Sequence, residues 1–142
     1  MILVLNTKDK EQALWQLYQD DKLLASQLVT KFEQNDSFLV ALDKLFEKTG
    51  KNLSLVTAFI LLVKEASLTQ VKLAAAIINT LAWIEAKPIA GEFFYHLTEA
   101  EVLSQQFAKI SKLKGFTPLK VEYLRPVDIT ISKKVNKFKL TK

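Results

Sequence analysis

The sequence contains no cysteine, and this absence excludes several kinds of chemistry. Without thiols, the chain has no disulfide, thiolate metal site, iron–sulfur cluster or cysteine nucleophile. A single histidine, His96, excludes sites that need two or more imidazoles. The three glycines are isolated from one another, so the glycine-rich phosphate loops of nucleotide-binding motifs are missing as well. We therefore expect no cofactor and no bound metal.

Residue types that serve in catalysis are present, but they do not form a recognisable constellation. His96 follows Glu92 by one helical turn, and a general base needs such an orienting carboxylate. No nucleophile can be assigned to this pair, so we interpret His96 as a structural residue. Asp20 and Asp21 are adjacent and would point apart on a helix, which favours a capping or turn role. We predict that the protein is not an enzyme and assign no catalytic residue.

Long apolar runs are also absent. The longest run covers residues 53–63, and the next covers residues 71–84 with two polar interruptions. Both are shorter than the roughly 20 residues that a membrane-spanning helix needs. The first residues lack the basic start and the small-residue cleavage site of a secretory signal. We expect a cytoplasmic protein without membrane contact.

The length of 142 residues, with 49% hydrophobic and 25% charged residues, predicts one domain with a substantial core. The fold predicted from the sequence is α+β, a predominantly helical single domain with a small C-terminal antiparallel sheet. The helical body covers about residues 7–114, and a basic, β-rich part covers about residues 116–142. A short apolar run at residues 2–5 is a candidate strand that could join the sheet.

Helical spacing of apolar residues predicts most of this body. Two segments, residues 54–66 and 68–86, are apolar on nearly every side, which is typical of a pair of buried central helices. Asn79 interrupts the second one, and a buried amide there must find a hydrogen-bond partner. Further helices are predicted at residues 7–18, 23–32, 36–49, 89–97 and 99–114. Capping boxes at residues 67–70 and 98–101 begin the helices 68–86 and 99–114, and Gly50 and Gly115 follow the ends of the helices 36–49 and 99–114.

A period of two replaces the helical spacing near the C-terminus. Apolar residues alternate with polar ones over residues 120–123, 127–132 and 137–141, which predicts three short strands. A helix at 68–86, a helix at 89–97, a helix at 99–114 and a strand pair at 119–132 would follow the order of a winged helix-turn-helix. This arrangement is one alternative for the C-terminal half.

Positive charge is concentrated at the C-terminal end. Residues 1–100 hold 10 Lys and Arg against 12 Asp and Glu, whereas residues 101–142 hold 10 against 3, which together give the net charge of +5. Lysine-rich surfaces bind phosphate backbones by releasing condensed counterions. The candidate nucleic-acid-binding residues are Lys109, Lys112, Lys114, Lys120, Arg125, Lys133, Lys134, Lys137 and Lys139.

The resulting hypothesis is a non-enzymatic accessory subunit that contacts a nucleic-acid backbone and works within a larger complex. The chain has one arginine, and base reading favours arginine, so we expect backbone contact without sequence specificity. The alternative is a protein–protein adaptor or assembly factor whose basic end docks on an acidic partner. A third reading treats the lysines as a solvated edge that prevents strand pairing. A protein partner or a second copy of the chain is expected under either function.

Overall fold

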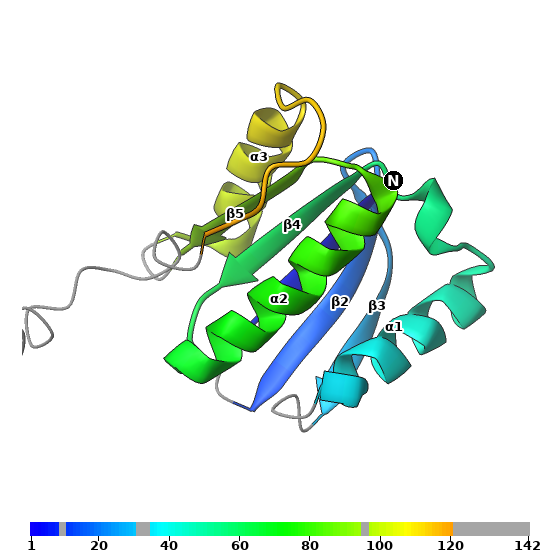
Figure 1. Ribbon diagram of the computed structural model, residues 1–142, viewed down its shortest axis with the longest axis vertical. Helices are drawn as coiled ribbons and strands as arrows, with labels where there is room; N and C mark the ends of the chain where they lie inside the picture. Colours follow the sequence, from blue (N-terminus) through cyan, green and yellow to red (C-terminus); the bar gives the residue numbers. More distant parts are fainter. Residues whose placement is uncertain (9–10, 31–34, 95–96, 121–142) are drawn as a thin grey trace, which may run out of the picture.

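The computed structural model describes residues 1–8, 11–30, 35–94 and 97–120, and within them the chain forms a five-stranded mixed sheet (Figure 1). The strands are β1 (Ile2–Thr7), β2 (Gln12–Gln19), β3 (Lys22–Thr30), β4 (Ala58–Val63) and β5 (Ile89–Phe93). The helices are α1 (Asn35–Thr49), α2 (Leu68–Glu85) and α3 (Glu99–Ile110), with one 3-10 turn at Leu53–Leu55. The prediction of a predominantly helical fold with a small C-terminal sheet is therefore wrong.

Two apolar strands form the centre of the sheet. Its order is β3-β2-β1-β4-β5, with β1 parallel to β4 and β4 parallel to β5. All six residues of β4 are buried, because helices cover both faces of the sheet at this strand. A short, uninterrupted apolar run is typical of such a strand. The predicted strand at residues 2–5 exists as β1, but it lies at the centre of the sheet.

The antiparallel part of the sheet replaces the predicted helices at residues 7–18 and 23–32. In β2, Ala13, Trp15 and Leu17 face one side of the sheet, while Gln16 and Tyr18 face the other. This alternation has a period of two, which overrides the helical spacing of the same apolar residues. Asp20 takes a left-handed backbone conformation with φ of +56° in the turn between β2 and β3.

The helices cover the two faces of the sheet unequally. Residues of α1 and α2 share a hydrophobic core with one face, and residues of α3 share a second core with the other. Figure 1 shows α1 and α2 side by side in front of the sheet, with α3 behind it. Among the described residues, no helix combines the length and the apolar character that a membrane span requires.

The predicted starts of α2 and α3 and the predicted end of α1 are confirmed, whereas α3 ends at Ile110, before the predicted stop at Gly115, and its start has only the Thr98 half of the predicted capping box. Ser67 and Gln70 form the capping box of α2, with reciprocal hydrogen bonds of 3.2 and 2.8 Å. The Thr98 hydroxyl accepts a hydrogen bond of 3.1 Å from the Glu101 N–H at the start of α3. Gly50 follows α1 with φ of +68°, the left-handed conformation that glycine adopts without strain.

Two further predicted helices are strands instead. Residues 58–63 form β4, and residues 89–93 form β5, so the predicted helices at 54–66 and 89–97 are wrong. The winged helix-turn-helix is wrong for the same reason, because its second helix is absent. Glu92 lies on β5, so the helical spacing that paired it with His96 does not apply. His96 and the strands predicted from residue 121 onward lie outside the described residues.

The chain after α3 returns to the face that α2 covers. Phe116 and Leu119 pack against the core on that face, and we call residues 116–119 the strap. The Asn79 amide holds the strap at both backbone groups of Leu119: it accepts from the N–H at 2.8 Å and donates to the carbonyl at 3.0 Å. The prediction that Asn79 must find a partner is confirmed, and that partner is main chain.

Candidate functional site

A layer of polar side chains lies between α3 and the carboxyl-terminal ends of the parallel strands. We call it the polar layer. Asn6 on β1 and Glu92 on β5 occupy one row across the sheet, since both are in register with Leu62 of β4. In open α/β sheets, this end of the strands is where ligands usually bind. The polar layer consists of Asn6, Lys8, Gln16, Glu92, Glu99 and Gln106.

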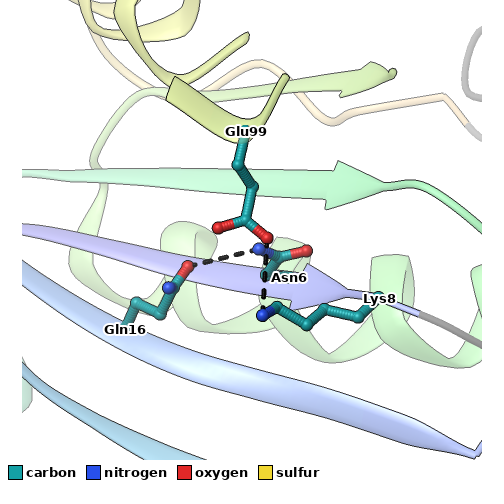
Figure 2. Close-up of polar contacts among 4 residues, drawn as sticks. All are labelled: Asn6, Lys8, Gln16 and Glu99. Atoms are coloured by element: carbon teal, nitrogen blue, oxygen red, sulfur yellow. Dashed lines mark hydrogen bonds and ion pairs between the residues drawn. The ribbon is translucent and has the colours of Figure 1, made fainter. Parts of the chain in front are cut away.

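Each interaction within the polar layer joins two different elements. The Asn6 amide donates to Gln16 Oε1 at 3.5 Å, linking β1 to β2. The Gln106 amide donates to Glu92 Oε2 at 3.5 Å, linking α3 to β5. Figure 2 shows the Glu99 carboxylate above Asn6 and paired with Lys8, at an N–O distance of 3.6 Å. These interactions therefore join α3 to β5 and to Lys8, the residue after β1, and they join β1 to β2.

Two buried oxygens of the polar layer have no hydrogen-bond partner among the described residues. They are Asn6 Oδ1 and Gln106 Oε1, on side chains that are 0% and 2% exposed. An unsatisfied buried acceptor costs about 1–3 kcal/mol. Native proteins therefore keep few such atoms, and those present need a physical reason.

Tyr18 extends this layer toward the other end of the sheet. Its ring meets Phe107 of α3 edge-on, with ring centroids 5.3 Å apart. Burial raises the pKa of the Tyr18 hydroxyl, and the Glu99 carboxylate raises it further. Both effects favour the neutral phenol, so Tyr18 acts here as a packed, uncharged side chain.

The opposite side of the molecule carries an apolar groove between α1 and α2, of about 370 Å³. Its lining includes Leu39 of α1 and Ile84 of α2, and Ile84 is 57% exposed. Trp83, the neighbour of Ile84, is 65% exposed. We call this surface the α1–α2 face, and it comprises Leu39, Leu73, Ala76, Ile77, Thr80, Leu81, Trp83 and Ile84.

The lysines that the sequence predicts as phosphate contacts divide into two groups. Lys109, Lys112 and Lys114 lie in the last turn of α3 and directly after it, and all three are exposed. Lys120 is exposed just beyond the strap. The remaining candidates lie outside the described residues: Arg125, Lys133, Lys134, Lys137 and Lys139. The structure thus brings three of the nine candidates together.

Neither the polar layer nor the α1–α2 face was identified from the sequence as a site. Asn6, a polar residue directly after the apolar run at residues 2–5, is the one local signal that could have indicated the end of a buried strand. Residues 73–84 contain no charged side chain, and this was interpreted as complete burial. Their partial exposure is instead the sign of an uncovered surface.

The described residues thus define an open, mixed α/β sheet with helices on both faces. No family model matches the sequence, and no curated protein matches it. Among solved structures, the chain is similar to YeaZ from Pseudomonas aeruginosa, with a TM-score of 0.54 and 22% identity over 63% of this chain and 43% of that one.

A second solved structure is similar as well. It is described as an uncharacterized protein with similarity to peptidase YEAZ from Pseudomonas aeruginosa, and the match has a TM-score of 0.56 and 20% identity. It covers 76% of this chain and 47% of the other. The present chain thus spans less than half the length of either structure. At these identities, the likeness establishes a shared fold.

Proposed function

We propose that this chain is a non-catalytic, cytoplasmic docking subunit that pairs with a second copy of itself through the α1–α2 face. The exposure of this face is the observation that carries the proposal. Burying an aliphatic or aromatic side chain of this size contributes about 1.5–3 kcal/mol. Monomeric proteins rarely leave such a contiguous apolar surface in water. A partner that covers Trp83 and Ile84 would therefore be stabilised mainly by the hydrophobic effect.

The shape of the α1–α2 face favours a second copy as the partner. A two-fold interface brings the same surface of both subunits into contact, so that surface must be complementary to itself. Here the exposed Trp83 lies beside the apolar groove, because it is one helical turn from Thr80, which lines the groove. Each copy would place its protruding side chain toward the groove of the other.

The charge of the α1–α2 face also permits self-association. The chain has a net charge of +5, so two copies repel each other weakly overall. Between Lys72 and Glu85, however, α2 carries no charged residue. Pairing through this stretch therefore brings no like charges into close contact and buries no unpaired charge.

Sedimentation velocity tests this function. From about 1 to 200 µM, we expect a reversible dimer of the wild-type chain. Replacing Ile84 by glutamate would bury a lone carboxylate in the interface and weaken pairing by about a hundredfold or more. The matched control is Leu28→Glu, because Leu28 is an exposed leucine of β3 on the opposite face of the sheet. A wild-type chain that stays monomeric, or an Ile84→Glu dimer as tight as the wild type, contradicts the proposal.

Contact with a nucleic-acid phosphate backbone is a second candidate function. The exposure of Lys109, Lys112 and Lys114 on one short stretch favours it. Under this hypothesis, binding is salt-sensitive and independent of sequence. If no nucleic acid binds, the adaptor hypothesis takes precedence. In that hypothesis the same lysines dock on an acidic protein.

Fluorescence anisotropy with generic single-stranded and duplex nucleic acids at two salt concentrations tests this candidate. Changing Lys109, Lys112 and Lys114 together to glutamine should weaken binding uniformly and lower the salt slope by about 3 units. The control changes three exposed lysines elsewhere, Lys22, Lys44 and Lys72. Equal losses in both triple variants would exclude a specific role for the lysines after α3.

A further inference from the structure

A pocket of about 350 Å³ lies between α3 and the turn that joins β2 to β3. It is on the face of the sheet that α3 covers, and the α1–α2 face is on the other. The four residues that α3 contributes share one side of the helix, because they are spaced by three or four residues. We call it the turn pocket, and it is lined by Tyr18, Asp21, Ala100, Leu103, Ser104 and Phe107.

The turn pocket offers oxygen acceptors and no positive charge. Among the described residues, its lining has one carboxylate, Asp21, and the hydroxyls of Tyr18 and Ser104, but no basic side chain. Tyr18 is only 7% exposed, and its hydroxyl has no hydrogen-bond partner in the part of the chain that the structure describes. Unlike the Asn6 and Gln106 oxygens, the Tyr18 oxygen is not sealed from solvent, and it lines the pocket. A polar group in this position needs a partner from outside the fold.

Two aromatic rings form one corner of the turn pocket. Tyr18 and Phe107 meet edge-on, with their planes at 68°. The face of an aromatic ring attracts a cation within about 6 Å of its centroid. Burial raises the pKa of the Tyr18 hydroxyl, and the negative charge of Glu99 raises it further, so that charge acts on the phenol. Glu99 is paired with Lys8, whereas Asp21 has no ion-pair partner within the described residues.

We propose that the turn pocket binds an alkylammonium group, from a free aliphatic amine or from the end of a partner's lysine side chain. A protonated primary amine has three N–H donors, and the lining offers oxygen acceptors on Tyr18, Asp21 and Ser104. The side chains of Ala100 and Leu103 provide apolar contact for the alkyl chain. A volume of about 350 Å³ is at the small end of ligand pockets, which suits a short amine.

Nuclear magnetic resonance titration of the full chain with n-butylammonium chloride tests the proposal. We expect saturable shifts at the amides of Tyr18, Asp21 and Ser104, with a dissociation constant in the low millimolar range. The matched probe is n-butanol, which has the same number of heavy atoms and no charge. It should bind at least about tenfold more weakly, because the ion pair and the cation–π contact are lost. Sodium chloride at equal ionic strength should produce none of these shifts.

Two conservative substitutions test the lining. Asp21→Asn should weaken butylammonium binding about fivefold, because it removes the unpaired charge. Tyr18→Phe keeps the ring and removes the hydroxyl acceptor, which should weaken binding about threefold. The control is Asp43→Asn, which removes an exposed carboxylate on α1, across the sheet from the pocket. It should leave the affinity unchanged, and circular dichroism should show that every variant is folded.

Absence of saturable shifts up to about 50 mM butylammonium would overturn the proposal. So would butanol binding as tight as that of butylammonium, or unchanged affinity in both Asp21→Asn and Tyr18→Phe. A second probe, Nα-acetyl-lysine methyl amide, separates the two sources of the ammonium group. Binding of this probe assigns the pocket to a lysine side chain, and binding of butylammonium alone assigns it to a free amine. The dimer measured by sedimentation is independent of these outcomes, because the α1–α2 face lies across the sheet.

Discussion

Replacing Trp15 by alanine is expected to destabilise the protein by about 3–5 kcal/mol, the usual cost of removing a large buried aromatic ring. Trp15 is fully buried on β2 and meets Phe38 of α1 edge-on, with ring centroids 6.5 Å apart. Its indole N–H donates to the Phe38 carbonyl at 2.8 Å. The substitution therefore removes both packing and the hydrogen bond that joins the start of α1 to the sheet.

Urea unfolding followed by far-ultraviolet circular dichroism measures this effect. The chain has two tryptophans, and the second, Trp83, is largely exposed, so fluorescence would report the variant's unfolding poorly. Trp15→Phe is the informative companion, because it keeps a ring and loses the N–H donor, at a cost of about 1–3 kcal/mol. A Trp15→Ala variant within about 1 kcal/mol of the wild type would show that Trp15 does not hold α1 on the sheet.

Replacing Asn79 by leucine is expected to release the strap from α2. The change removes both hydrogen bonds to Leu119 and leaves its carbonyl and N–H without their partner. Each hydrogen bond contributes about 0.5–1.5 kcal/mol net to the free energy of unfolding, and a buried donor or acceptor left unsatisfied costs more. We expect a loss of about 2–3 kcal/mol, confined largely to the strap.

Hydrogen exchange with mass spectrometry distinguishes local release from global unfolding. In the Asn79→Leu variant, amides of residues 116–120 should exchange much faster, while those of β1 and β4 keep their protection. Thr80→Val serves as the control, because the Thr80 hydroxyl donates to the Ala76 carbonyl within α2. Unchanged exchange at Leu119 in the Asn79 variant would show that apolar packing alone fixes the strap.

Helix ends could be predicted from the sequence because their determinants are local. Ser67 and Gln70 satisfy each other's backbone groups within a single turn, and Gly50 needs only its own backbone freedom. The same holds for Thr98 at the start of α3. These features depend on no distant residue, so the structure confirms them.

The strands could not be predicted in the same way, because their hydrogen-bond partners are distant in sequence. In register, Leu5 lies beside Leu61, more than fifty residues later. A short run such as residues 58–63 is apolar on both sides, so periodicity cannot distinguish a buried strand from a buried helix. In β2, the apolar residues at 13, 14, 17 and 18 fit a helical spacing by coincidence, and pairing with β1 and β3 decides otherwise.

The same contrast between local and distant determinants applies to the candidate sites. Charge is a property of composition, so the exposed lysines after α3 could be named from the sequence. The polar layer depends on bringing Asn6, Glu92 and Glu99 together from β1, β5 and α3. No local pattern encodes that proximity, and it becomes visible only when the order of the strands is known.

The central position of β1 also constrains the order in which the chain can fold during synthesis. Its pairing with β2 is available early, because the two strands are neighbours in sequence. Its parallel pairing with β4 must wait until residue 63 has left the ribosome. Until then, one edge of the apolar β1 remains unpaired, and unpaired edges of this kind favour aggregation. The centre of the finished sheet is thus completed late, through the non-local pairing that folds most slowly.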